Sequence, residues 1–259
     1  MSDQNLQERF SLRNKVAIIT GASKGIGAAM AQSLAGFGAQ VVISSRKQEA
    51  VDMVAAELRA AGLQAAGIAC HVGDDEQLRA LVEQTLATFG AIDILINNAA
   101  INPVFGPLSE ATPELFDKIM HINVKSCFQL ANLCYPHMKK RGGGSIINIS
   151  SVEGLKPGMG LGLYSVSKAA LIMLTQNQAR EWGADGIRAN VICPGLIQTK
   201  FSAALWQNEQ ILEQIVGDIP AGRMGQVEEI AGLAAFLASD AASYCTGSVY
   251  TADGGYTIS

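Results

Sequence analysis

Short continuous apolar runs alternate with longer helix-like segments along the whole chain. Residues 16–20 form the first run, and a glycine-rich turn leads from them into an amphipathic stretch. Continuous apolar runs of four to eight residues are typical of strands buried on both faces of a parallel sheet. The pattern predicts strands over residues 16–20, 40–45, 64–70, 92–97, 145–150, 187–192 and 248–251, and helices over residues 26–37, 47–61, 75–89, 114–140, 163–182 and 227–238.

This order predicts an α/β fold, a doubly wound parallel sheet of about seven strands with helices on both faces, as in a Rossmann fold. No linker or repeat divides residues 1–259, so we expect a single domain. Pro136 should kink or end the helix predicted over residues 114–140. Residues 195–225 interrupt the rhythm, and a loop of that length is typically functional, so we expect a substrate-binding insertion there.

Composition narrows the possible partners. The 259 residues are 49% hydrophobic and 16% charged, with a formal net charge of −4 and scattered basic residues. We therefore expect neither nucleic acid nor a membrane as partner. Residues 1–14 are polar and lack the apolar core of a signal peptide, and the five cysteines form no C-x-x-C pair. These features favour a cytoplasmic protein with reduced thiols and without a bound metal.

Tyr164 and Lys168 form the first candidate for chemistry. Residues four apart on a helix share one face, so both side chains can reach one small volume. A free phenol titrates near ~10, and an adjacent ammonium is expected to lower its pKa toward the working range. Upstream, the hydroxyl of Ser151 could hold a carbonyl oxygen that Tyr164 protonates. The three side chains together suit the addition of hydride and a proton to C=O, or the reverse.

The turn that follows the first predicted strand is suited to a dinucleotide. Gly21, Gly25 and Gly27 permit a tight turn and the close approach of a pyrophosphate to the N-terminus of a helix. At the end of the second strand the chain has Arg46 where a carboxylate would select NAD. Arg46 and Lys24, with a hydrogen bond from Ser45, could bind a 2′-phosphate, which predicts NADP(H). Alternatively, both cations are ordinary surface residues.

With these residues in view, the chain resembles the short-chain dehydrogenase/reductase family from Lys15 to Thr257. The resemblance rests on motifs that occur in the family's order. They are Thr20-Gly-Ala-Ser-Lys-Gly-Ile-Gly27, Asn97-Asn-Ala-Ala100, Asn123, Ser151, the Tyr164-x-x-x-Lys168 pair, and the segment from Pro194-Gly195 to Thr199.

The resemblance implies a division of roles. Tyr164 would be the general acid or base, Lys168 would hold the nicotinamide ribose, Ser151 would polarise the carbonyl, and Asn123 would fix a water that links Lys168 to solvent. For Asn123, the alternative is a residue of a capped or kinked helix. The implied dinucleotide contacts are Gly21, Ser23, Lys24, Gly25, Ile26, Gly27, Ser45, Arg46, His71, Val72, Asn98, Ala99, Tyr164, Lys168, Pro194, Gly195, Ile197 and Thr199.

Two positions depart from the family pattern. His71-Val72 stands where the family has Asp-Val beside the adenine, so the adenine contact passes to a ring nitrogen or the backbone, or His71 has no cofactor role. Ala100 replaces a glycine. Several stretches resemble the NADPH-dependent carbonyl reductase branch. These are Ser44-Ser-Arg-Lys-Gln48, His71-Val-Gly73, Asn98-Ala-Ala-Ile-Asn-Pro103, Arg141-Gly-Gly-Gly-Ser145 and Pro194-Gly-Leu-Ile197. The peroxisomal tripeptide of some members is absent, which again favours a cytoplasmic protein.

Apolar residues around the predicted site indicate a small-molecule ketone, aldehyde or secondary alcohol with a hydrophobic body. The candidates for substrate contact are Glu153, Met159, Phe201, Leu205 and Trp206. Glu153 either selects a cationic or hydroxylated substrate or points to solvent. We also expect a homotetramer built of two-fold pairs, with a dimer as the alternative. The helices expected to pair carry Phe128, Leu133 and Cys134 on one and Ala170, Met173 and Leu174 on the other.

Two other functions remain open at this point. A 3-oxoacyl thioester reductase would need a basic patch for an acidic carrier protein, and its candidate cations are Lys125, Lys139, Lys140 and Arg141. A non-catalytic dinucleotide sensor would not need the intact set of Ser151, Tyr164 and Lys168, so the set favours an enzyme.

Overall fold

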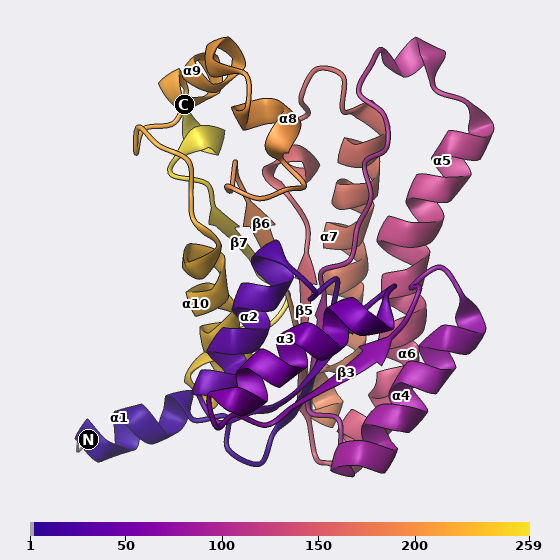
Figure 1. Cartoon of the computed structure of the whole chain (residues 1–259), viewed down its shortest axis with the longest axis vertical. Coiled ribbons are helices and arrows are strands. Elements are labelled where there is room, and N and C mark those ends of the chain that lie inside the picture. Colours follow the sequence, from indigo (N-terminus) through magenta and orange to yellow (C-terminus); the bar gives the residue numbers. More distant parts are fainter. Residues whose placement is uncertain (1–2) are drawn as a thin grey trace.

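Parallel strands form the central layer of the protein (Figure 1). The computed structural model describes residues 3–259, without the side chains of residues 3–6, 204 and 211. Within this part of the chain one seven-stranded sheet has the order β3-β2-β1-β4-β5-β6-β7. The strands are β1 (Val16–Thr20), β2 (Gln40–Ser45), β3 (Ala65–Ala69), β4 (Ile94–Asn97), β5 (Gly144–Ile149), β6 (Ile187–Pro194) and β7 (Val249–Ala252). The predicted Rossmann-type fold is confirmed.

Helices cover both faces of the sheet. They are α1 (Asp3–Phe10), α2 (Gly25–Gly36), α3 (Gln48–Ala60), α4 (Asp75–Phe89), α5 (Pro113–Met120), α6 (Ser126–Lys140), α7 (Gly162–Trp182), α8 (Ala203–Trp206), α9 (Glu209–Gly217) and α10 (Val227–Ala238). The shorter turns are η1 (Leu108–Glu110), η2 (His121–Lys125), η3 (Val152–Gly154), η4 (Gly183–Asp185), η5 (Asp240–Ala242) and η6 (Tyr256–Ile258). No helix among residues 3–259 combines the length and apolarity that crossing a bilayer requires.

The apolar runs are continuous because each strand is buried on both sides. Ile19 and Ile43 face a core formed with α2, α3 and α10. Ile18 and Val42 face a second core formed with α4, α6 and α7. Successive side chains of a strand point to opposite faces, so both sets must be apolar.

The strand order indicates at which edge of the sheet a ligand would bind. The chain winds outward from β1 to β3, and then returns to start again at β4 on the other side of β1. Ligands of doubly wound sheets bind beyond the carboxyl ends of the strands, at this point of reversal. The segments after β1, β2, β3, β4, β5 and β6 all begin at that edge, and they carry nearly all of the predicted site residues.

The helix predicted over residues 114–140 is divided. The π-helical turn η2 separates α5 from α6, and the helix does not end at Pro136 but continues through it to Lys140. Proline removes one donor, which leaves the carbonyl of Asn132 without its helical partner. Both Pro136 and Asn132 are exposed, so water can satisfy that carbonyl.

Two further segments differ from the sequence prediction. Helix α1 lies in a stretch that we predicted only to be polar, and the ring of its last residue, Phe10, packs 6.5 Å from Phe37 and 6.3 Å from Phe236. The insertion 195–225 is not a plain loop, because it contains α8 and α9. In Figure 1 these two helices lie at the top of the molecule, across from α5.

Candidate active site

The turn between β1 and α2 leaves room for a ligand to approach its backbone closely. Gly21 and Gly25 have positive φ angles of 64° and 58°. A Cβ on Gly27 would lie 2.5 Å from the carbonyl oxygen of Gly21. Lys24 is the N-cap of α2, and its side chain makes no capping hydrogen bond. The first N–H groups of α2 therefore remain available, and with the helix dipole they favour an anion such as a phosphate.

The Asn97-Asn98-Ala99-Ala100 stretch holds this turn in place. The side-chain amide of Asn98 donates to the carbonyls of Thr20 and Gly21 at 2.9 and 3.2 Å. The hydroxyl of Thr20 accepts from the backbone N–H groups of Asn98 and Ala99 at 3.0 and 3.1 Å. Ala100 fits because its φ is not positive; among the described non-glycine residues only Asn14 has a positive φ.

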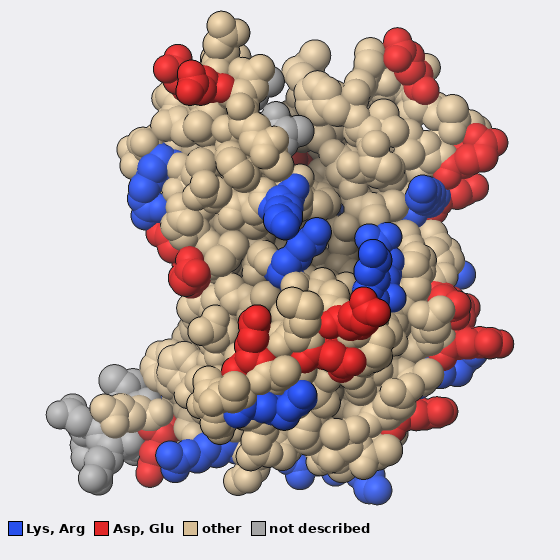
Figure 2. Space-filling view, viewed as in Figure 1, with Lys and Arg blue, Asp and Glu red and all other residues tan. Residues whose placement is uncertain are grey.

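The end of β2 presents cations and hydroxyls next to the turn. The hydroxyl of Ser23 donates to that of Ser45 at 3.1 Å, which links the first two strand ends. Arg46 and Lys24 are exposed, and neither forms an ion pair with a described residue. Figure 2 shows Lys and Arg side chains along the lower edge of the hollow in the upper middle of the molecule. The glycine cradle and these free cations fit a phosphorylated dinucleotide.

His71 and Val72 follow β3 at the same edge. The exposed His71 accepts a hydrogen bond through Nδ1 from the N–H of Gly73 at 3.2 Å. The proton of the neutral ring is then on Nε2, which can donate but cannot accept as the family carboxylate would. His121 contacts the same glycine on its other side, donating from Nε2 to the Gly73 carbonyl at 2.8 Å. An adenine contact by His71 or Val72 stays a prediction.

Helix α7 brings Tyr164 and Lys168 together. The ammonium of Lys168 lies 5.5 Å from the centre of the Tyr164 ring, and it donates to the carbonyl of Ile149 at 2.8 Å. Lys168 is 2% exposed, and burial lowers its pKa from 10.5 to about 8. A buried ammonium with this pKa is poised to exchange a proton near neutral pH.

The expected lowering of the Tyr164 pKa is not found. Burial of the phenol raises its pKa well above 10.0, because the phenolate loses its hydration. The hydroxyl of Ser151, hydrogen-bonded to the phenol, acts in the opposite direction, while the charge of Glu153 adds to the increase. Lys168 is not among the causes of this shift, because with a pKa of about 8 it has already lost its proton at the pH where the phenol would ionise.

Asn123 lies in the π-helical turn and is 1% exposed. Its Oδ1 accepts from the N–H of Ile101 at 2.9 Å, and its Nδ2 donates to the Ile101 carbonyl at 2.9 Å and to Ser167 Oγ at 3.0 Å. Ser167 in turn donates to the backbone carbonyl of Tyr164 at 2.7 Å. Asn123 therefore joins the segment after β4 to α7. The residue lies in an irregular helix, as one interpretation expected, while its role in fixing a water stays a prediction.

The segment after β6 covers the glycine turn. The Thr199 methyl group lies 3.6 Å from where a Cβ of Gly25 would be. Trp206 Nε1 donates to the Thr199 carbonyl at 3.0 Å, and the hydroxyl of Ser202 donates to the carbonyl of Ile197. Earlier in the segment, Pro194 pairs with β7, and a Cβ on Gly195 would lie 2.7 Å from Asp253. The indole N–H of Trp206 is thus bonded to backbone, and contact of its ring with a substrate stays a prediction.

The other substrate candidates differ in exposure and in their contacts. The ring of Phe201 is 60% exposed and lies 6.3 Å from that of Tyr164, so it borders the candidate site. Met159 is 92% exposed, and Leu205 is half-buried in α8. Glu153 does not point freely to solvent, because its carboxylate accepts from the N–H of Gly158 at 2.6 Å and from Ser165 at 3.3 Å.

Three residues that we did not predict support the site. They are Ser167 between Asn123 and Tyr164, Ile149 whose carbonyl accepts from Lys168, and Thr20 whose hydroxyl holds Asn98 and Ala99. Thr20 belongs to the glycine-turn motif and could have been found from it. Ser167 shares a helix with Tyr164 at i+3, but its partner depends on the turn η2, which no sequence pattern indicated.

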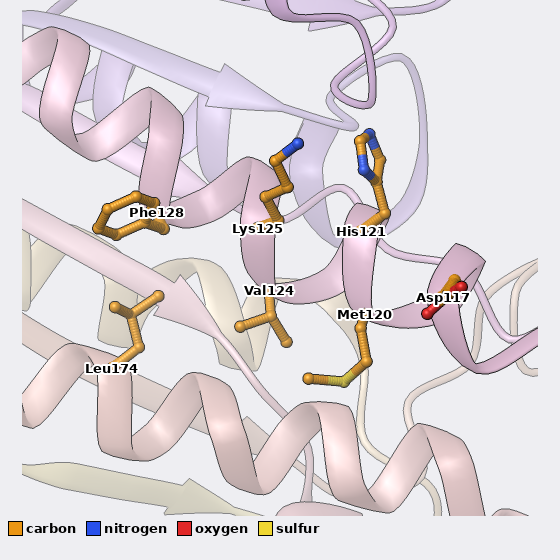
Figure 3. A pocket seen from close by; sticks show the side chains of 7 residues that line it. All are labelled: Asp117, Met120, His121, Val124, Lys125, Phe128 and Leu174. Carbon is orange, nitrogen blue, oxygen red and sulfur yellow. The ribbon is translucent and has the colours of Figure 1, made fainter. Parts of the chain in front are cut away.

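A hollow of about 550 Å³ lies where α5 and α6 face α7 (Figure 3), and none of the candidate catalytic residues lines it. It is lined by Asp117, Met120, His121, Val124, Lys125, Phe128 and Leu174. In Figure 3 the apolar side chains of Val124, Phe128 and Leu174 turn into the hollow, whereas Lys125 points away. Cys134, which we expected on the same face, is completely buried and cannot contact a second subunit.

Comparison with known proteins gives the family. Residues 21–257 match a family model described as enoyl-(acyl carrier protein) reductase. Dehydrogenase/reductase SDR family member 4 of Oryctolagus cuniculus is 47% identical over 255 residues, which are 98% of this chain and 98% of that protein. The human protein of the same name is 42% identical over 98% of this chain and 92% of its own length.

Solved structures agree with the sequence relatives. A gluconate 5-dehydrogenase from Burkholderia cenocepacia, in complex with NADP and tartrate, superposes with a TM-score of 0.94 at 36% identity, covering 98% of this chain and 99% of that one. A 7α-hydroxysteroid dehydrogenase complexed with NADH and 7-oxo glycochenodeoxycholic acid has a TM-score of 0.93 at 34% identity, covering 98% of both chains. The chain belongs to the short-chain dehydrogenase/reductase family and is an oxidoreductase.

Proposed function

We propose that the protein transfers hydride between NADP(H) and a small ketone or aldehyde, or the matching secondary alcohol. The observation that carries the proposal is the convergence of Tyr164, Lys168 and Ser151 beside the glycine turn. Tyr164 and Lys168 are adjacent on α7, and the Ser151 hydroxyl bonds to the phenol. A nicotinamide cofactor would supply the hydride when it is bound.

The chain's own residues would handle the carbonyl oxygen and the proton. Ser151 holds the carbonyl oxygen, and Tyr164 donates its phenolic proton to that oxygen as it gains charge. The high pKa of Tyr164 keeps the phenol protonated, as a general acid for reduction must be. Lys168, with a pKa of about 8, is suited to return a proton to the tyrosine, and Asn123 would hold the route to solvent.

NADP(H) is the preferred cofactor in this proposal because of the charges at the end of β2. Arg46 and Lys24 carry no described carboxylate partner, and Ser45 stands beside them. A guanidinium binds a 2′-phosphate through two hydrogen bonds and gives nothing comparable to a free ribose hydroxyl. The solved relatives named above include one with NADP and one with NADH, and Arg46 and Lys24 support NADP(H) as the cofactor of this chain.

The substrate is proposed to be hydrophobic, with residues 195–225 forming part of its binding site. Phe201 is strongly exposed beside Tyr164, and Met159, in the segment between η3 and α7, is strongly exposed as well. Apolar side chains that remain open to solvent at the mouth of a site favour an apolar ligand. The carbonyl reductase branch that the sequence resembles agrees with this class.

The alternative functions have less support. A 3-oxoacyl thioester reductase would need free cations near the site, but Lys139 pairs with Asp185 and Arg141 with Asp93. Both cations, with Lys140, lie at the end of α6 that leads into the start of β5, at the opposite edge of the sheet from Tyr164. A dinucleotide sensor would have no use for the intact set of Ser151, Tyr164 and Lys168.

The proposed assembly is a homotetramer in the cytoplasm, with the face of the 550 Å³ hollow at one interface. Phe128, which lines the hollow, is 48% exposed, and Met173, the residue before Leu174 on α7, is 59% exposed. Burial of such side chains against a two-fold copy is favourable. Sedimentation of the wild type and of Phe128→Glu should give a tetramer and a smaller species; a wild-type monomer would contradict the assembly.

The function is tested by initial rates of NADPH and NADH oxidation with an aryl ketone, a diketone, retinal and an acetoacetyl thioester. NADPH-dependent reduction of the first three supports the proposal. Turnover of the thioester alone would favour the carrier-linked alternative, and turnover with NADH alone would refute the assignment of Arg46 and Lys24. In the same assay Arg46→Asp should weaken NADPH binding by about tenfold, and Arg79→Asp, at an exposed site on α4, is the control for the change in net charge.

A further inference from the structure

Glu153 is a half-buried carboxylate two residues after Ser151, and it forms no ion pair with any residue between 3 and 259. Its carboxylate Oε2 accepts from the N–H of Gly158 at 2.6 Å and from the hydroxyl of Ser165 at 3.3 Å. Burying a carboxylate without a cation costs free energy, even with two hydrogen bonds. Burial accordingly raises the pKa of Glu153, against the effect of those bonds. The unfavourable burial of the Glu153 carboxylate indicates that this residue has a specific role.

The bonds of Glu153 connect the two sides of the candidate site. Its backbone N–H donates to Ser151 Oγ at 3.2 Å, and its carboxylate reaches Ser165, the residue next to Tyr164. The same short segment touches α7 at two more places. Ser150 donates to the Lys168 carbonyl at 2.8 Å, and a Cβ on Gly154 would lie 2.8 Å from the Lys168 backbone.

We propose that Glu153 is a positioning residue that fixes Ser151 and the 154–161 loop against α7 and holds a negative charge beside the phenol of Tyr164. The inference rests on the proposed function for its kinetic consequences only. Removing the charge while keeping the shape should make the phenolate easier to form, because a nearby like charge disfavours it. Removing the hydrogen bonds of the carboxylate should instead loosen the 154–161 loop from α7.

Other groups around Glu153 define what the charge acts on. From α7 it faces Tyr164, and from η6 it faces Tyr256, whose pKa is raised by burial and then by Glu153 and Asp218. Lys156 on the same loop does not neutralise it, since that ammonium donates to the Ser259 carbonyl and lies 5.1 Å from the Tyr256 ring centre. The charge therefore acts mainly on the two tyrosines.

Two substitutions separate the charge from the bonds. Glu153→Gln keeps an acceptor for Gly158 and Ser165 but removes the charge. Ser165→Ala keeps the charge but removes the link to α7. Glu83→Gln on the exposed face of α4 is the control for net charge. Thermal unfolding of each variant establishes that it is folded.

The decisive readout is a pH titration of phenolate absorbance, with Tyr164→Phe and Tyr256→Phe to assign the signals. Glu153→Gln should move the Tyr164 titration to lower pH by on the order of one unit, and Ser165→Ala and Glu83→Gln should leave it in place. The pH limb of the carbonyl reduction rate should move with it. Ser165→Ala should lower kcat several-fold without moving the limb.

An unchanged Tyr164 titration in folded Glu153→Gln would overturn the inference. Because the titration needs no substrate, it remains decisive even if the wild-type protein reduces no carbonyl, an outcome that would refute the proposed function alone. An equal pH shift in Glu83→Gln would also overturn it, since the effect would then come from net charge rather than from the position of Glu153.

Discussion

The side-chain amide of Asn123 donates to Ser167 Oγ across 3.0 Å, and this bond joins the π-helical turn to the helix that carries Tyr164 and Lys168. Ser167 passes the connection on to the carbonyl of Tyr164. The position of the candidate acid, Tyr164, thus depends on Asn123, a residue far earlier in the chain.

Asn123→Leu should therefore damage both stability and turnover. It leaves buried partners at Ile101 and Ser167 unsatisfied, which typically costs about 1–3 kcal/mol for each group. We expect a fall of at least ~10-fold in kcat, alongside a lower denaturation midpoint in urea. Asn177→Ala, which removes a similar amide bond to the Met173 carbonyl on the exposed side of α7, is the matched control. Equal effects in the two variants would contradict the special role of Asn123.

Replacing glycine by alanine should be harmful near the start of α2 and stabilising at its end. Gly27→Ala places a methyl group 2.5 Å from the Gly21 carbonyl, so the turn must deform and dinucleotide affinity should fall. At Gly36, the last residue of the same helix, a Cβ meets nothing within 4 Å, so Gly36→Ala should stabilise the protein by up to about 1 kcal/mol. Thermal unfolding with and without NADPH distinguishes the effects, and intact NADPH affinity in Gly27→Ala would rule out the cradle.

Burial of Lys168 should give stability a pH dependence of known sign. Its pKa is lowered from 10.5 to about 8 in the folded protein, so between these values the unfolded chain binds a proton that the native state does not. Stability contributed by this residue therefore rises with pH through this interval. Relative to Lys168→Met, the wild type should gain on the order of 2 kcal/mol across it in urea unfolding. A constant difference at all pH values would contradict the buried ammonium.

Trp206 should report on the segment that covers the glycine turn. Trp206→Phe removes the bond to the Thr199 carbonyl, worth about 1 kcal/mol, so the KM for NADPH should rise by roughly fivefold. Tryptophan fluorescence should respond to NADPH in Trp182→Phe and lose most of that response in Trp206→Phe. Trp182 is the control because it packs on Tyr135, at the far end of α7. A full response in Trp206→Phe would show that the segment does not meet the dinucleotide.

The sequence predicted the layered fold well because a buried parallel sheet imposes continuous apolar runs. Every predicted strand exists, with ends that shift by a few residues, as at residues 64–70, where β3 covers Ala65–Ala69. The prediction failed where tertiary contacts decide. Helix α1 depends on the packing of Phe10 against Phe37 and Phe236, and the π-helical turn around Asn123 has no periodicity of its own.

The same contrast holds for the candidate site. Tyr164, Lys168 and the glycine turn could be found from spacing, because helix geometry and steric demands fix which residues can stand there. The pKa of Tyr164 could not, since it depends on how deeply the phenol is buried and on the placement of Ser151 and Glu153 around it. The use of Glu153 and Trp206 to hold backbone groups also follows only from contacts between distant segments.

The most direct test of the account compares Tyr164→Phe with the wild type in NADPH-dependent reduction of an aryl ketone, together with direct measurement of NADPH binding. Tyr135→Phe, which changes a phenol bonded to Asp185, is the matched control. We predict that Tyr164→Phe lowers turnover by at least ~10²-fold and leaves NADPH affinity nearly unchanged, while Tyr135→Phe retains activity. Wild-type turnover in Tyr164→Phe would contradict the assignment of Tyr164 as the proton donor.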